Sequence, residues 1–97
     1  MIKRIVKLTF RKEEIDNFMI IFEQSKKGIR AFEGCHHMEL LRGLEPDNVL
    51  FTFSIWESEA ALNNYRNSQL FQNTWTKTKA LFADRPQAWS VSLIDEG

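Results

Sequence analysis

The sequence predicts an α+β domain in the order β-α-β-β-α-β, with a four-stranded antiparallel sheet and the helices on one face. Four segments read as strands: residues alternate with strand periodicity over 2–10 and 89–94, apolar residues recur on one face over 49–56, and 35–42 lies between two turns. Two longer segments between them carry apolar residues at the helical spacing of three and four positions. Because 97 residues are enough for one small domain and too few for two, we expect a single domain over residues 1–97.

The first strand and the first helix follow from a change of period. Over residues 2–10, Val6, Leu8 and Phe10 fall on one face of a strand. Further along, apolar positions recur at i, i+3, i+4 and i+7, which predicts a helical stripe made of Ile15, Phe18, Met19 and Phe22. We expect Gly28 to end this helix or to weaken its last turn.

The middle of the chain predicts a hairpin. Gly34 marks a break, after which residues 35–42 form the second strand and residues 49–56 the third. Residues 44–48 between them contain proline, aspartate and asparagine, which favour a turn. Two strands joined by such a short loop pair as an antiparallel hairpin.

The last third of the chain predicts a broken helix and a fourth strand. Ser58 is a suitable N-cap for a helix over residues 59–66, and Ser68 for a second helical piece that runs to about Phe82. A proline four residues later ends the helical region. The alternation over residues 89–94 then predicts the fourth strand.

Charge and composition exclude several classes of function. The chain has 13 basic and 13 acidic residues, whereas nucleic-acid binding needs an excess of Lys and Arg. No run approaches the roughly 20 apolar residues of a membrane span, and no signal peptide is visible. Cys35, the only cysteine, cannot form an intrachain disulfide, which agrees with a reducing compartment. We expect a cytoplasmic protein that binds neither nucleic acid nor a membrane.

Apolar residues on both faces of the sheet predict a homodimer. A lone domain with helices on one side should show a polar face on the other. Instead, every predicted strand carries apolar residues in both parities, namely Ile5 and Val6, Met38 and Leu41, Phe51 and Trp56, and Leu93 and Ile94. Two such sheets facing each other would bury these groups.

Two motifs give the chain a family resemblance. Residues 32–36 read Phe-Glu-Gly-Cys-His, and residues 55–62 read Ile-Trp-Glu-Ser-Glu-Ala-Ala-Leu. With Tyr65, Phe71 and Trp75 downstream, they resemble the antibiotic biosynthesis monooxygenase family over nearly the whole chain. The resemblance implies that this ferredoxin-like unit forms a dimeric α/β barrel, in which two sheets pack face to face and each pocket lies between sheet and helices.

The resemblance also implies what members of the family do. They include quinol and polyketide monooxygenases that use no metal or flavin, and others degrade haem. The haem-degrading branch has Asn, Trp and His at three pocket positions, which here correspond to Lys7 (or Val6), Tyr65 and Trp75. Because the absent histidine would be the proximal iron ligand, the resemblance disfavours haem degradation.

Aromatic and imidazole side chains are the candidates for the site. The expected catalytic residues are His37, Tyr65 and Trp75, and the expected substrate-binding residues are His36, Phe71 and Phe82. Tyrosine and tryptophan can stack on a planar substrate and orient a carbonyl, although core packing is the alternative for each. Adjacent strand residues point to opposite faces, so the two histidines cannot both serve one metal, and we expect no metal site. Arg66 and Arg85 could hold an acidic substrate group, although solvated charges are the usual case.

Three functions are compatible with these residues. The first is a cofactor-independent monooxygenase acting on a small aromatic, phenolic or quinol substrate that itself supplies the electrons. The second is a non-catalytic homodimer that binds a small hydrophobic or aromatic ligand in stress response or regulation. The third is a haem-binding or haem-degrading variant with a different axial ligand. The resemblance favours the first, which needs no cofactor.

Overall fold

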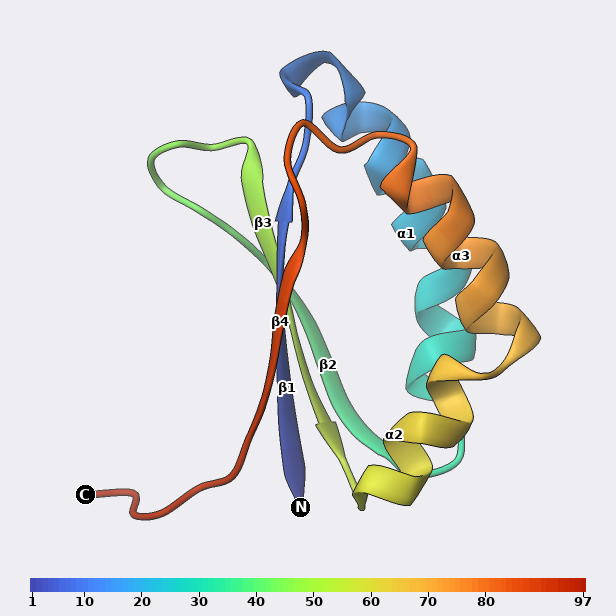
Figure 1. The fold of residues 1–97 in the computed structure, drawn as a ribbon, viewed down its shortest axis with the longest axis vertical. Helices are drawn as coiled ribbons and strands as arrows, with labels where there is room; N and C mark the ends of the chain where they lie inside the picture. The colour runs from blue at the N-terminus through green and yellow to red at the C-terminus, as the bar shows by residue number, and fades with distance from the viewer.

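Three α-helices lie on one face of a four-stranded antiparallel sheet, and the other face is bare (Figure 1). The computed structural model describes residues 1–97. Its elements are β1 (Ile2–Thr9), a short 3-10 helix (Lys12–Glu14), α1 (Ile15–Arg30), β2 (Cys35–Arg42), β3 (Val49–Trp56), α2 (Glu59–Arg66), α3 (Gln69–Lys79) and β4 (Gln87–Val91). This arrangement confirms the predicted ferredoxin-like α+β class.

The sheet runs in the order β2-β3-β1-β4, so β1 and β3 are its central strands. These two strands pair antiparallel, with Leu8 opposite Leu50 and Ile2 opposite Trp56. Leu8, Leu50 and Trp56 are buried under the helices, so the even-numbered positions of both strands face the helices. The predicted alternation along β1 is therefore confirmed.

Serine side chains cap the two pieces of the broken helix, as the sequence predicts. Ser58 Oγ accepts a hydrogen bond from the N–H of Ala61 at 3.1 Å, and Ser68 Oγ accepts one from the N–H of Phe71 at 3.1 Å. Each bond satisfies a backbone donor that the first helical turn leaves unpaired. None of the helices has the length and apolar content of a membrane span.

Gly28 lies inside α1 and does not end it, contrary to the first of the two expectations for this residue. The helix continues to Arg30. A Cβ added at Gly28 would lie only 3.2 Å from Leu70 Cδ2 on α3. The glycine therefore allows close packing of two helices, and the chain reverses further on, at Gly34, which has a φ of 87°.

The fourth strand lies earlier in the chain than predicted. β4 spans Gln87–Val91, and its last pair with β1 joins Val91 to Lys3. Because β1 begins only one residue before Lys3, Leu93 and Ile94 have no strand residue opposite them. Both side chains are exposed, so the predicted strand over residues 89–94 is wrong in its bounds.

The core consists of two apolar clusters at opposite ends of the helix-facing side of the sheet. The larger cluster contains Leu8, Phe10, Ile15, Phe18 and Leu50. The smaller cluster contains Cys35, Trp56 and Leu62. The helices are therefore anchored to the sheet at both ends, and the middle of the interface is less tightly closed.

A continuous chain of aromatic rings connects the two clusters. Trp56 stacks on Tyr65 with ring centroids 4.8 Å apart, and Tyr65 meets Phe71 edge-on at 5.3 Å. Phe71 stacks on Trp75 at 5.8 Å, and Trp75 meets Phe82 at 5.7 Å. Pairs of this geometry contribute about 0.5–1.5 kcal/mol beyond their buried area, so the chain fixes α2 and α3 against each other.

The face of the sheet opposite the helices is uncovered (Figure 1) and carries several apolar side chains. Odd-numbered residues of the central strands lie on it, with Phe53 between Ile5 and Glu39 in the register. Trp89 and Val91 of β4 remain 45 % and 41 % exposed. Exposed apolar side chains gathered on one face, here with charged residues such as Lys7 and Glu39 among them, indicate an interaction site.

We expect Gly34→Ala to destabilise the protein and Gly97→Ala to leave its stability unchanged. A Cβ at Gly34 would lie 2.5 Å from the Cβ of Ala61, whereas a Cβ at Gly97 would meet nothing within 4 Å. Both glycines have a positive φ, but Gly97 is exposed and its N–H makes a local hydrogen bond to Asp95 Oδ1, so its backbone can relax. Gly34→Ala should lower the free energy of unfolding by about 2 kcal/mol or more, measured by urea denaturation. Equal effects of the two substitutions would contradict this account.

Candidate functional site

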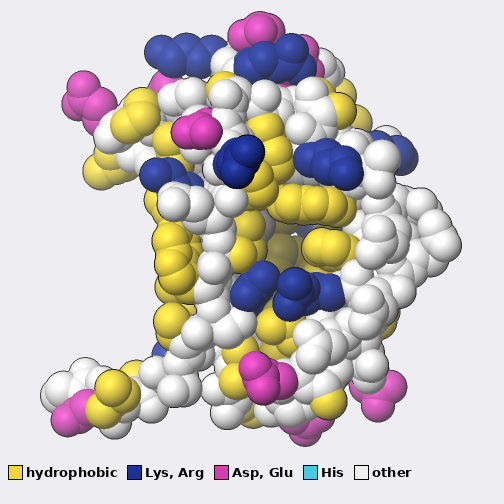
Figure 2. Space-filling model, in the orientation of Figure 1, with side chains coloured by type: hydrophobic (Ala, Val, Ile, Leu, Met, Phe, Trp, Pro, Cys, Tyr) yellow, Lys and Arg dark blue, Asp and Glu magenta, His cyan; other side chains and the backbone are white.

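A cavity of about 550 Å³ lies between the sheet and the helices, bounded at its ends by residues of the two core clusters. Every α-helix and every strand contributes to its wall. Figure 2 shows its mouth as a hollow with hydrophobic side chains inside and Lys and Arg side chains beside it. The volume lies within the range of small-molecule sites.

The cavity exists because the helix-facing positions of the central strands carry large apolar side chains at both ends, whereas those in the middle, Val6 apart, are polar. Buried leucines close one end and Trp56 closes the other. Between them lie Arg4, Thr52 and Ser54, which do not fill the space as leucine or phenylalanine would. Trp56 Nε1 donates a hydrogen bond to Ser54 Oγ at 2.9 Å, which fixes the indole at its end of the cavity.

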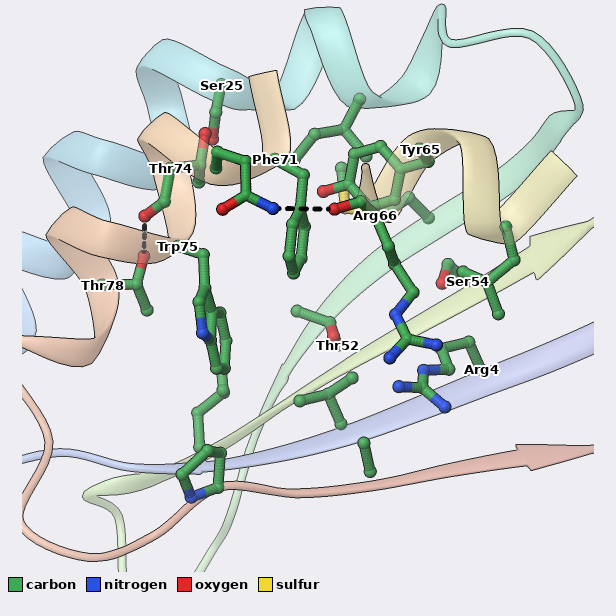
Figure 3. A pocket seen from close by; sticks show the side chains of 18 of the residues that line it. Arg4, Ser25, Thr52, Ser54, Tyr65, Arg66, Phe71, Thr74, Trp75 and Thr78 are labelled. Carbon is green, nitrogen blue, oxygen red and sulfur yellow. Dashed lines mark hydrogen bonds between the residues drawn. The ribbon is translucent and has the colours of Figure 1, made fainter. Parts of the chain in front are cut away.

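Tyr65, Phe71 and Trp75 form the aromatic wall of the cavity, across from the sheet (Figure 3). The wall spans the break between α2 and α3, where the ring of Phe71 contacts both of the others. No hydrogen bond between the lining residues drawn in Figure 3 uses the Tyr65 hydroxyl or the Trp75 indole N–H. Both groups are therefore able to donate to a bound ligand.

Two aliphatic hydroxyls of the cavity, those of Thr78 and Ser25, are already engaged within their helices. Thr78 Oγ1 donates to the carbonyl oxygen of Thr74 at 2.8 Å, and Ser25 Oγ donates to that of Ile21 at 2.9 Å. Such bonds satisfy the hydroxyls within their own helices. These two hydroxyls are therefore not free to contact a ligand.

Two guanidinium groups, those of Arg4 and Arg66, lie side by side next to the sheet (Figure 3). Arg4 projects from β1, and its Nη1 donates to Ser90 Oγ at 3.0 Å. Arg66 is the last residue of α2. Burial first, and then the positive charge of Arg66, lower the pKa of the Arg4 guanidinium, although it stays protonated at neutral pH.

Tyr65 remains protonated well beyond the ordinary range of a phenol. Burial first, and then the nearby Cys35 thiolate, raise the pKa of Tyr65. Burial is also the main cause that raises the pKa of Cys35, so the thiol is neutral at pH 7. At neutral pH Tyr65 is consequently a hydrogen-bond donor in the cavity and not a base.

The structure brings together three of the six predicted site residues. Tyr65, Phe71 and Trp75 line the same cavity, although their roles in binding or catalysis stay predictions. Phe82 lies outside the cavity wall and packs against the larger core cluster. Its contact with the aromatic wall is the edge-on contact of its ring with Trp75.

Neither histidine lines the cavity, and a β-bulge lies where they occur in β2. The register of β2 on β3 shifts between Cys35 and His37, so simple alternation does not hold there. Cys35 is buried under the helices, whereas His37 lies on the uncovered face, with its Nε2 2.6 Å from Glu39 Oε2. His36 is exposed. No three His, Cys, Asp or Glu side chains converge as a metal site.

For two pairs of residues that the sequence left as alternatives, the structure shows which member lines the cavity. Of the two arginines considered for an acidic group, Arg66 lines the cavity, and Arg85 is exposed outside it. At the strand position compared with the haem-degrading branch, Val6 lines the cavity, whereas Lys7 has the opposite parity and lies on the uncovered face.

Sequence reasoning missed Arg4, Thr52 and Ser54. They occupy helix-facing positions in the middle of the central strands, where the pattern elsewhere is apolar. A signal for them exists in the sequence, because Leu8 and Trp56 define the inward parity of each strand. Polar residues at that parity mark the sheet side of a cavity, provided that the pairing of the two strands is known.

Comparison with known proteins agrees with this architecture. A family model described as antibiotic biosynthesis monooxygenase matches residues 1–77. A crystal structure of an antibiotic biosynthesis monooxygenase has a TM-score of 0.92 at 16 % identity, covering 98 % of this chain and 100 % of that one. Rv0793 from Mycobacterium tuberculosis has a TM-score of 0.89 at 19 % identity, covering 98 % and 96 % of the two chains.

A mutant of SnoaB, a cofactor-independent oxygenase from Streptomyces nogalater, has a TM-score of 0.85 at 16 % identity. The match covers 97 % of this chain and 93 % of that one. No curated protein sequence matches this chain significantly. At such low identities the structural likenesses establish a common fold and leave substrates undetermined.

Tyr65 should resist alkaline titration in the folded protein. It is the only tyrosine, so the tyrosinate absorbance reports on this residue alone. Because folding raises its pKa, the associated stabilisation is complete below the unfolded pKa of about 10 and is lost as the pH rises toward the folded pKa. Above pH 10, wild type should lose about 1.4 kcal/mol per pH unit relative to Tyr65→Phe, measured by urea denaturation. A tyrosinate band in the folded protein near pH 10 would contradict this.

Proposed function

Because this chain belongs to the antibiotic biosynthesis monooxygenase family, whose model matches residues 1–77, we propose that it is a cofactor-independent monooxygenase acting on a small aromatic substrate of the phenol or quinol type. The observation that carries this proposal is the aromatic wall of Tyr65, Phe71 and Trp75, which faces polar sheet residues across one cavity. The fold shared with a cofactor-independent oxygenase supports the reaction class.

The residues of the cavity suit a reaction in which the substrate supplies the electrons. The substrate ring stacks against Phe71 and Trp75, and the protonated Tyr65 donates a hydrogen bond to a substrate oxygen. The ionised substrate then reduces dioxygen, so that one oxygen atom enters the substrate as a carbonyl and the other leaves as water. Apolar walls shield the reactive anion from side reactions with bulk solvent.

One observation favours a second candidate, a non-catalytic protein that binds a small aromatic ligand. No Asp, Glu or His side chain lines the cavity, so the wall contains no general base for the first proton transfer. As a monooxygenase, the protein must release the substrate proton to solvent. As a ligand-binding protein, it needs no proton transfer, and the same cavity suffices.

We further propose that the chain forms a homodimer through the uncovered face of its sheet. That face carries the rings of Phe51, Phe53 and Trp89 together with aliphatic neighbours, and none of the three helices covers it (Figure 1). A second copy presents an identical apolar face, and two-fold pairing of identical patches is the commonest form of oligomer. The membership of the chain in its family supports the same assembly.

Dimerisation should depend on Phe53. Phe53→Glu places a charge in the middle of the proposed interface and should raise the dimer dissociation constant about 30-fold or more, corresponding to about 2 kcal/mol. Ile20→Glu is the matched control, because Ile20 is 56 % exposed on α1, on the far side of the molecule. Sedimentation velocity measures both variants. Wild type that sediments as a folded monomer at high concentration would remove the proposal.

Oxygen uptake with a panel of quinols and phenols tests the reaction. Wild type should consume one dioxygen per substrate oxidised, and Trp75→Ala should lower kcat/KM about tenfold or more, because the substrate loses a stacking surface. Lys77→Gln, an exposed position on the same helix, should keep wild-type activity. Binding of these compounds without any oxygen consumption would instead establish the non-catalytic candidate.

A further inference from the structure

The arginine pair of the cavity, Arg4 and Arg66, has no counter-charge within the chain. The ion pairs of the chain join Lys26 to Glu23, His37 to Glu39 and Arg42 to Asp47, all away from these two groups. The one side-chain hydrogen bond of the pair is that from Arg4 to the neutral hydroxyl of Ser90. A guanidinium has five N–H donors, so most donors of both groups remain available.

This arrangement is unfavourable for the empty protein. Two like charges repel each other more strongly where protein replaces water, and Arg4 is partly buried beside the sheet. The lowered pKa of Arg4 has the same two causes, its burial and the charge of Arg66. An oxygen anion between the two guanidinium groups would replace their mutual repulsion with attraction to the anion. Guanidinium groups bind carboxylates and similar anions through short, charge-assisted hydrogen bonds.

The aromatic wall restricts the kind of anion that fits. Tyr65, Phe71 and Trp75 border the same cavity as the arginine pair, so a ligand that reaches both must combine a flat ring system with an acidic oxygen group. The volume of about 550 Å³ admits a ligand of two or three fused rings. A small inorganic anion would leave the aromatic wall without a partner.

We propose that the cavity binds a planar aromatic anion, with its rings on the wall of Phe71 and Trp75 and its acidic oxygen held between the guanidinium groups of Arg4 and Arg66. The acidic oxygen belongs to a carboxylate substituent or to an ionised phenol. That this ligand is a substrate rests on the proposed monooxygenase function. The inference adds the chemical class of the substrate, an aromatic anion.

The pair also supplies what the cavity otherwise lacks for the proposed reaction. With no carboxylate or imidazole in the wall, the substrate must lose its proton to water. Two positive charges beside the acidic oxygen favour the ionised form and lower the pKa of the bound phenol. The ionised ring is the species that gives its electrons to dioxygen, so the arginines promote the reaction without taking up a proton.

The test compares 2-naphthoate with the neutral isostere 2-naphthamide by isothermal titration calorimetry under nitrogen, where no turnover occurs. Wild type should bind the carboxylate at least tenfold more tightly, and the preference should shrink as salt is added. Arg66→Gln and Arg4→Gln should each reduce this preference about tenfold. Arg85→Gln, which removes an exposed guanidinium outside the cavity, should leave it unchanged.

Two further measurements keep the test decisive. Arg66 is exposed, so the Arg66→Gln variant should fold. It should melt at or above the wild-type temperature, because the substitution relieves the repulsion between Arg4 and Arg66. A lower melting temperature would indicate a structural role for Arg66 and count against the proposal. The absorbance of bound 2-naphthol at neutral pH identifies the acidic group: a naphtholate band supports the phenolate form, and its absence alongside a naphthoate preference supports the carboxylate form.

Equal binding of naphthoate and naphthamide by wild type, or a preference that survives in both cavity variants, overturns the proposal. Failure of the proposed monooxygenase function is distinguishable from this result. A failed monooxygenase function would appear as an absence of oxygen uptake. The preference for an anion is measured without oxygen and depends on binding alone.

Discussion

The structure depends on how the helices are held to one face of the sheet. Packing is tight at the two ends of the central strands, where Leu8 and Leu50 meet α1 and Trp56 meets α2. In the middle, the inward positions are Arg4, Val6, Thr52 and Ser54, and no large apolar side chain fills the space. The cavity is thus a consequence of the strand sequence, and the anchored ends keep it from collapsing.

Local periodicity was sufficient to predict the fold class, because each element carries its own pattern. The helix caps Ser58 and Ser68 and the uncovered apolar face follow from residues that are near one another in sequence. The bounds of β4 did not follow, since they depend on its pairing with β1 at the opposite end of the chain. The bulge at His36 was missed for the same reason, because a register shift is a property of two strands and not of one.

The candidate site was predictable in part. Tyr65, Phe71 and Trp75 could be identified because aromatic residues recur along one helical region and match a family pattern. The sheet side of the cavity could not, since the role of Arg4 depends on its position opposite Ser54 in the sheet and beside Arg66 at the end of α2. The histidines show the reverse error, because their residue type indicated chemistry but neither of them lines the cavity.

The three tryptophans of the chain occupy three different compartments. Trp56 is 1 % exposed in the core, Trp75 lines the cavity, and Trp89 lies 45 % exposed on the bare face of the sheet. The chain therefore has one intrinsic fluorophore in the core, one in the cavity wall and one on the uncovered face of the sheet. With two of the three replaced by phenylalanine, emission from the remaining indole would separately follow unfolding, binding in the cavity or the proposed association of subunits, without any attached dye.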